Sequence, residues 1–436
     1  MRSFKQGIHP PEEKKLSKDK KIVKIPPPSQ VIIPLSQHTG APCRPLVSKK
    51  DKVEKGQKIG DQDAFISSPV HSSVTGKVVS IEKWPHPTLG EAEAVIIERE
   101  GEEEKNSPSR EVDLSSLSPQ DIRKIVREAG IVGMGGAAFP THVKLSPPEG
   151  KKIDTVILNG CECEPYLTAD YRIMLERSDD CIFGLKAIMR ATGAKRGYIG
   201  IENNKKEAIS LMKEKIKGEK NIEVISLKTK YPQGAEKILI KAILKREVPS
   251  GGLPLDVGVV VNNVGTSVAI AEAIKFGKPL IERVITVTGY GVEKPCNLLV
   301  PIGTPIKYIL DFCGCKEDVS VVINGGPMMG IAQYSLDAPI IKGTSGILVI
   351  SENTVSLDKE SPCVRCARCV DHCPMGLLPT TLAKLVKKEK WDKLVEFNIM
   401  DCIECGCCTY VCPSKIPIVQ LIKWGKNELR RLQSQK

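Results

Sequence analysis

Two cysteine runs near the end of the chain constrain its fold more than any other feature. Each run has the spacing Cys-x2-Cys-x2-Cys-x3-Cys-Pro, and the runs begin at Cys363 and Cys402. In proteins with this pattern three thiolates of a run bind one [4Fe–4S] cluster and the fourth binds the other cluster. The spacing therefore predicts two cubane clusters. The first ligand set is Cys363, Cys366, Cys369 and Cys412, and the second is Cys402, Cys405, Cys408 and Cys373.

The cysteine content of the whole chain favours metal over disulfides. The chain has 436 residues and 16 cysteines, whereas disulfide frameworks are typical of short secreted domains. Zinc sites or free thiols are the alternative interpretation of the two runs. Cys407 lies inside the second run but off its ligand spacing, so we expect it not to bind a cluster. Apolar residues between the runs recur at helical intervals, which favours a helical ferredoxin-type domain over residues 353–436.

Charge and hydropathy exclude several other classes of protein. The net charge of +12 would suit a nucleic-acid partner, but only 4% of residues are aromatic, so stacking platforms are scarce and we expect no such partner. No apolar run approaches the ~18 residues of a membrane span, and the first 24 residues lack the hydrophobic core of a signal peptide. We therefore expect a cytoplasmic chain, or one on the cytoplasmic face of a membrane. The basic ends of the chain would meet solvent, partner subunits or anionic lipid.

The order of predicted elements divides the chain into domains. After a basic N-terminal tail over 1–24, strand and turn signals over 25–105 resemble the two halves of a biotinyl/lipoyl-type barrel-sandwich domain. The hairpin between those halves lacks the lysine that would carry a prosthetic group. Strands and helices alternate over 112–283, which predicts a largely parallel sheet covered by helices. Short strands return over 284–352 around one helix, before the helical domain at 353–436.

A glycine-rich loop over 130–144 is the second candidate site. It follows a predicted helix, whereas the dinucleotide-binding fingerprint follows a strand, so a structural turn stays an alternative. Polar residues follow three predicted strands of the same domain, at the end of the sheet where open α/β folds bind ligands. These polar segments are Asn159–Asp170, Tyr231–Glu236 and Asn262–Thr266.

Together these segments resemble the flavin-binding subunit of respiratory complex I and its relatives. That family has a glycine-rich loop ending in Phe-Pro-Thr and lysine, and an Asn-x-x-Glu-x-Glu-Pro segment. The chain is more similar still to the C-subunit family of Rnf complexes, through Gly7–Glu12, Pro34–Gly40 and two ferredoxin runs that follow a β-grasp domain. This resemblance implies a multidomain α/β and β fold: an N-terminal barrel-sandwich hybrid, a Rossmann-like flavin/NADH-binding domain, a β-grasp (SLBB-type) domain and a helical domain with two cubane clusters.

The resemblance also implies cofactors and the residues that bind them. The cofactors are noncovalent FMN and two [4Fe–4S] clusters, and NAD(H) is the substrate. The implied FMN-binding residues are Gly133, Gly135, Lys144, Asn159, Glu162, Asn262, Asn263 and Thr266. The implied NAD-binding residues are Phe139, which would stack on the nucleotide, Glu164 and Glu236. One departure leaves a flavin contact open, because Cys161 and Cys163 stand where complex I relatives have aspartate and serine.

The implied function is electron transfer. The chain would be the NAD-reacting subunit of a membrane-bound, ion-translocating ferredoxin:NAD oxidoreductase, peripheral on the cytoplasmic side of the cell membrane. FMN would exchange a hydride with NAD(H), and single electrons would then pass through the clusters to or from membrane-embedded and ferredoxin-like partner subunits. NADH is preferred to NADPH because no arginine cluster suits a 2′-phosphate. The alternatives are a cobalamin reductase-type flavin/iron–sulfur protein and a non-catalytic cluster relay.

Overall fold

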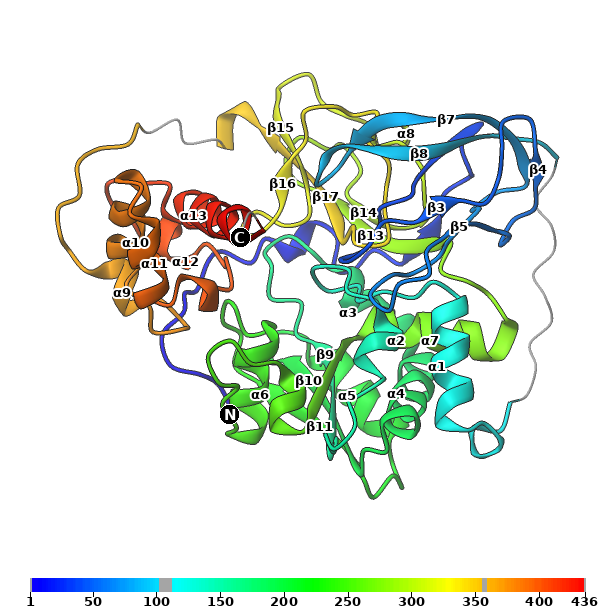
Figure 1. The fold of residues 1–436 in the computed structure, drawn as a ribbon, viewed down its shortest axis with the longest axis horizontal. Coiled ribbons are helices and arrows are strands. Elements are labelled where there is room, and N and C mark those ends of the chain that lie inside the picture. The colour runs from blue at the N-terminus through cyan, green and yellow to red at the C-terminus, as the bar shows by residue number, and fades with distance from the viewer. Residues whose placement is uncertain (1, 102–111, 355–358, 435–436) are drawn as a thin grey trace.

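The computed structural model describes residues 2–101, 112–354 and 359–434. Figure 1 shows the α/β domain below two β-rich domains, with the helical C-terminal domain to one side. The N-terminal segment, drawn in blue, runs between the α/β and helical domains before it reaches the β-rich part. Short 3-10 helices lie between the larger elements: η1 (Lys14–Leu16), η2 (Leu114–Ser116), η3 (Pro254–Val257), η4 (Glu352–Thr354) and η5 (Ile399–Asp401).

The first β-rich domain is a sandwich of two antiparallel sheets. One sheet has the order β2-β8-β7-β4 and the other the order β3-β5-β6. Val31 and Ile33 face the space between the sheets, while Ile32 between them packs on the opposite face, as the period of a strand requires. The strands are β2 (Gln30–Pro34), β3 (Arg44–Pro45), β4 (Lys52–Val53), β5 (Lys58–Asp61), β6 (Val70–His71), β7 (Gly76–His86) and β8 (Gly90–Arg99).

The α/β domain has a four-stranded sheet of order β11-β10-β9-β12 in which every pairing is parallel. Its strands are β9 (Thr155–Gly160), β10 (Arg196–Glu202), β11 (Ile222–Leu227) and β12 (Val259–Asn263). Its helices are α1 (Pro119–Glu128), α2 (Thr141–Lys144), α3 (Ala169–Glu176), α4 (Ser178–Thr192), α5 (Lys206–Lys215), α6 (Glu236–Leu244) and α7 (Val264–Phe276). Between β9 and β10 the chain forms two helices and not one, because the backbone of Arg177 (φ −132°, ψ 31°) leaves the helical region.

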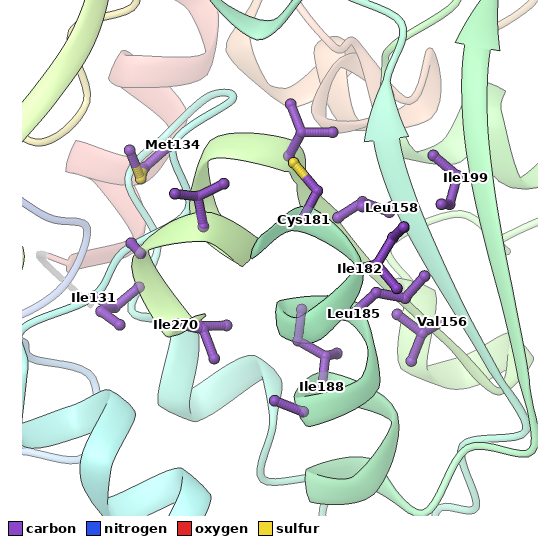
Figure 2. Packing of buried hydrophobic residues seen from close by; sticks show 14 of the residues in the cluster. Ile131, Met134, Val156, Leu158, Cys181, Ile182, Leu185, Ile188, Ile199 and Ile270 are labelled. Atoms are coloured by element: carbon purple, nitrogen blue, oxygen red, sulfur yellow. The ribbon is translucent and has the colours of Figure 1, made fainter. Parts of the chain in front are cut away.

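Both faces of this sheet are buried, which fixes where a ligand can bind. Val156 and Leu158 of β9 pack on the face covered by α4 and α7, whereas Ile157 packs on the α6 side. Figure 2 shows the first of these faces, with Cys181 and Leu185 of α4 against the strands. Because the faces are filled, the open positions lie beyond the carboxyl ends of the strands. The three polar segments predicted as ligand-binding begin at these ends.

The second β-rich domain has a six-stranded sheet of order β1-β14-β13-β17-β15-β16. Its elements are β13 (Glu282–Thr288), β14 (Cys296–Pro301), α8 (Ile306–Cys313), β15 (Val319–Asn324), β16 (Ile331–Ala332) and β17 (Gly346–Ser351). The remaining strand, β1 (Ile22–Lys24), comes from the N-terminal segment and pairs in parallel with β14.

The N-terminal segment therefore differs from the separate basic tail predicted over 1–24. Besides β1, it includes Ile8, whose backbone pairs with that of Tyr231, and Lys14, which is 9% exposed. The sequence pattern misled because lysines that bind protein carbonyls look the same in a sequence as lysines that face water.

The C-terminal domain is helical, as predicted from the spacing of apolar residues between the cysteine runs. It contains α9 (Arg368–Asp371), α10 (Pro379–Lys387), α11 (Trp391–Glu396), α12 (Cys407–Tyr410) and α13 (Ile418–Ser434). Leu382, Val386 and Leu394 are buried against α13. Among the described residues, no helix combines the length and the hydrophobicity that crossing a bilayer requires.

Candidate functional site

The glycine-rich loop folds over the first turn of α7. The Met134 amide donates to Thr266 Oγ1 at 2.9 Å, and the Gly133 amide donates to the Phe139 carbonyl at 2.8 Å. A Cβ on Gly135 would lie 3.1 Å from Asn263, which is tighter than ordinary contact, so only glycine fits there easily. A Cβ on Gly136 would meet nothing within 4 Å, so the next position of the loop faces open space.

The end of β12 carries a buried amide without a partner. Asn262 is 3% exposed, and neither its Nδ2 nor its Oδ1 has a hydrogen-bond partner. Its neighbour Asn263 is fully engaged, because Oδ1 caps α7 by accepting from the Gly265 amide at 2.7 Å and Nδ2 donates to Asp170 at 2.6 Å. Burying an unpaired amide costs about 1–3 kcal/mol. The Asn262 side chain is therefore suited to a polar ligand such as FMN.

Asn159 and Glu162 organise the loop that follows β9. Asn159 Nδ2 donates to the Gly234 carbonyl at 2.8 Å, which links β9 to the segment before α6. The Glu162 carboxylate accepts from the Asp170 amide at 2.6 Å and caps α3. The Cys161 side chain is fully buried in the apolar cluster on the α6 side of the sheet. In this structure these side chains shape the border of the candidate site.

Lys14 holds the same loop from outside the domain and was missed by the sequence analysis. Its ammonium group donates to three carbonyls, those of Glu162 (2.9 Å), Glu164 (2.9 Å) and Leu167 (2.6 Å). Burial lowers the pKa of Lys14, nearby Lys205 lowers it further, and the charge of Glu162 opposes this shift. The loop that would carry both flavin and nucleotide contacts therefore depends on the N-terminal segment.

The three residues expected to bind NAD lie in different surroundings. Phe139 is partly buried at the end of the glycine-rich loop. Glu164 accepts from the Met328 amide at 3.1 Å, its Oε1 has no partner, and burial raises its pKa to about 7. Glu236 forms an ion pair with Lys144, so the structure joins one residue expected at the FMN to one expected at the nucleotide.

The cysteines of the two runs line two separate hollows. The first is a cavity of about 580 Å³ whose lining includes Cys363, Cys366, Cys369 and Cys412. The lining of the second includes Cys373, Cys402, Cys405 and Cys408, together with Cys407. Within the described residues, no three His, Cys, Asp or Glu side chains converge as they would on a single metal ion. Four thiols around one hollow are the ligand set that a cubane requires, and the second hollow, of about 20 Å³, is smaller than the first in this structure.

The second cysteine run lies directly against the α/β domain. Tyr231, which is 1% exposed, donates from its hydroxyl to the Cys405 carbonyl at 2.8 Å. Cys163, on the loop after β9, packs in the same apolar cluster as Cys405 and Cys407. Cys363 and Cys366 of the first run are exposed. The second hollow is therefore the one that lies against the α/β domain, beside the loop after β9, a placement that the cysteine spacing does not encode.

Four family models match successive parts of the chain. They are described as the RnfC barrel sandwich hybrid domain (residues 2–102), the Nuo51 FMN-binding domain (126–272), the SLBB domain (284–332) and the 4Fe-4S dicluster domain (362–416). Together with the sheets and helices above, these matches confirm the predicted fold class.

The chain is also similar over nearly its full length to named proteins. The C subunit of the proton-translocating ferredoxin:NAD(+) oxidoreductase complex of Clostridium ljungdahlii is 50% identical, covering 99% of this chain and 94% of that protein. The C subunit of the Na(+)-translocating complex of Acetobacterium woodii is 45% identical, covering 98% and 97%. The C subunit of the ion-translocating oxidoreductase complex of Rhodobacter capsulatus is 38% identical, covering 100% and 84%.

Solved structures of NAD+-reducing [NiFe]-hydrogenase share the fold. The chain in the H2-reduced state is 17% identical with a TM-score of 0.52, and the match covers 72% of this chain and 63% of that one. The air-oxidized state gives 19% identity, a TM-score of 0.50, and coverage of 64% and 54%. This chain therefore spans somewhat more than half of the hydrogenase chain.

Proposed function

Because the chain belongs to the C-subunit family of ion-translocating ferredoxin:NAD(+) oxidoreductase complexes, we propose that it is the NAD-reacting electron-transfer subunit of such a complex. The assignment to this family rests on sequence identity of 38–50% over nearly the whole chain. The structural observation that carries the function is the contact between the α/β domain, which would bind FMN, and the second cysteine run, made by Tyr231 and Cys405. This contact supports the proposal, because electron transfer requires the flavin and a cluster to lie close together.

The cofactors are FMN and [4Fe–4S] clusters, with NAD(H) as substrate. When bound, FMN converts the two-electron chemistry of the nicotinamide into single electrons that a cubane accepts. Within the site, Asn262 would supply its unpaired amide, and Gly135 and Gly136 would let the ligand approach the loop backbone. Asn263 and Thr266 hold that loop and α7 in place, and Lys144 would add a positive charge near the flavin. Asn159 and Glu162 keep the adjacent loop in position.

The contacts of the two cysteine runs support an order for the clusters. The second set (Cys402, Cys405, Cys408 and Cys373) would exchange electrons with the flavin, because its run packs on the α/β domain. The first set would exchange them with a partner, because Cys363 and Cys366 are exposed and the neighbouring Val364 is 67% exposed. An exposed apolar residue beside a cluster suits a protein partner better than water.

The partners would be membrane-embedded and ferredoxin-like subunits of the same complex. With no spanning helix in the described part of this chain, ion translocation would belong to those partners. The chain would attach peripherally, on the cytoplasmic side where NADH is available. Full-length similarity to the C subunits of these complexes favours this assignment over a cobalamin reductase.

The test is anaerobic reduction of the reconstituted chain. The protein is loaded with iron, sulfide and FMN, NADH is added, and visible and EPR spectra are recorded. Bleaching of the flavin, with growth of a reduced-cluster signal, is the expected result. An unbleached flavin beside oxidised clusters would overturn NADH input and favour a relay.

Bleaching without cluster reduction has a separate meaning. It would place the clusters at a lower potential than NADH, as reverse flow from ferredoxin requires. Reduction by dithionite distinguishes this case from failed cluster assembly. Co-purification with membrane subunits then separates the proposed complex from a cobalamin reductase.

A further inference from the structure

The carbonyls of the glycine-rich loop are held by donors from outside the α/β domain. Arg283, on β13 of the β-grasp sheet, donates from Nη2 to the Met134 carbonyl at 2.5 Å. Lys342, from the same domain, donates from Nζ to the Gly130 carbonyl at 2.6 Å. Thr39 of the sandwich domain donates to the Ala137 carbonyl at 2.6 Å. Both β-rich domains therefore fix the backbone of the loop that would bind FMN.

Arg283 stands out among these donors because it is a buried cation without a direct counterion. It is 4% exposed, its Nη1 donates to the Lys342 carbonyl at 2.8 Å, and its Nε has no partner. No carboxylate among the described residues lies within ion-pair distance of it. Burial lowers the pKa of Arg283 to about 10, so the group stays charged near neutrality. The charge of Asp170 raises that pKa, but the Asp170 carboxylate already accepts from Asn263.

A buried, unpaired charge is costly unless something compensates it. Next to Met134, the Gly135 amide has no acceptor among the described residues, and the loop covers the N-terminal turn of α7, which carries partial positive charge. The Asn262 amide is unpaired as well. The Arg283 Nε, the Gly135 amide and the Asn262 Nδ2 each lack an acceptor within the described part of the chain, and an anionic ligand with acceptor oxygens would supply one. A phosphate monoester has that chemistry.

We propose that Arg283 is a positioning residue of the flavin site that favours the phosphorylated flavin over the unphosphorylated one. It fixes the Met134 carbonyl, which turns the loop backbone toward the ligand, and its uncompensated charge raises the positive potential where the phosphate monoester binds. This inference rests on the proposed function, since it assumes that FMN occupies the site. It also gives the β-grasp domain a specific part in cofactor binding.

The test compares FMN with riboflavin, which lacks the phosphate. Dissociation constants are measured by quenching of flavin fluorescence on the full chain with its clusters loaded. Wild-type protein should bind FMN at least tenfold more tightly than riboflavin. Arg283→Met should weaken FMN binding about tenfold or more and riboflavin binding less than threefold. Arg283→Lys keeps the charge and should retain the preference for FMN.

The control is Arg246→Met, which removes the same charge at the other end of the sheet. Arg246 donates to Asp154 and Val257, just before β9 and β12 begin, and its replacement should leave both constants unchanged. Equal losses for the two flavins in Arg283→Met, or no loss, would overturn the inference. Equal dissociation constants of FMN and riboflavin for the wild-type protein would also overturn it. That measurement does not depend on whether Arg283→Met folds. Failure of the wild-type chain to bind either flavin would instead overturn the proposed function.

Discussion

Replacing Lys14 by methionine tests whether the N-terminal segment holds the loop after β9. Methionine keeps the length and much of the volume of the side chain but removes the ammonium group that donates to Glu162, Glu164 and Leu167. Three carbonyls, of which that of Leu167 is buried and the other two are partly buried, then lose a charged donor at once. We expect the loop to open more often while the sheet behind it keeps its structure.

The size of the effect follows from these contacts. A hydrogen bond from a charged donor contributes about 1.5–3 kcal/mol, so three contribute on the order of 4–9 kcal/mol. Burying the ammonium group costs several kcal/mol, which offsets about half of that sum. The free energy of local opening should therefore fall by about 2–4 kcal/mol, which corresponds to exchange about 30- to 1,000-fold faster.

Hydrogen–deuterium exchange measures how often the loop after β9 opens. The amides of Tyr166 and Thr168 are protected by Glu12 and Thr286, so they report opening of the loop. The matched control is Lys15→Met, because the Lys15 side chain is 70% exposed and lies 3.7 Å from Glu13. That control should change exchange less than threefold. Unchanged protection in Lys14→Met, or equal effects of the two substitutions, would refute the reasoning.

Other substitutions probe the carboxylate, the domain contact and the cluster ligands. Burial raises the pKa of Glu164 to about 7 from 4.5, so folding takes up a proton there and the free energy of unfolding falls as pH rises between those values. Glu164→Gln, followed in melts from pH 4.5 to 8, should remove about 2–3 kcal/mol of that decline, and an unaltered decline would contradict the shifted pKa. Tyr231→Phe leaves the Cys405 carbonyl without its donor, at a cost of about 1–3 kcal/mol. Iron should then be lost to a coloured chelator about tenfold faster. Release at the wild-type rate would argue against this contact. Cys407→Ser should keep about eight irons per chain whereas Cys408→Ser should lose about half of them, and equal iron in the two variants would disprove the ligand spacing.

The sequence contained the signals that local spacing can encode. The cysteine runs predict two ligand sets because a cubane imposes fixed spacing, and each predicted set lines one hollow of the structure. Alternating strands and helices predicted the parallel sheet, and polar residues at strand ends predicted where a ligand would enter. The assignment of each side chain to FMN or NAD remains a prediction, and Glu162 shows the difficulty because its carboxylate also caps α3.

Contacts between distant residues were not predictable. Lys14 and Arg283 each bind backbone carbonyls about 150 residues away along the chain. A carbonyl belongs to every residue, so such a bond leaves no pattern of residue types in either partner. Tyr231 was part of a recognised segment, yet its hydroxyl donates to the carbonyl of Cys405 in another domain. In the sequence the N-terminal lysines differ in nothing but position. Only the fold shows that Lys14 binds backbone carbonyls whereas Lys15 faces solvent.

The pairing of β1 with β14 has a consequence for how the chain is made. Ile22 pairs with Asn297, so the first strand leaves the ribosome about 275 residues before its partner does. At about 5–20 residues per second, translation takes roughly a quarter of a minute to a minute to cover that distance. Ile25, which is fully buried in the finished β-grasp core, stays without that core for the whole interval. Assembly of this sheet therefore joins the oldest part of the nascent chain to a much younger one, and a bulky fusion at the N-terminus would interfere with that step.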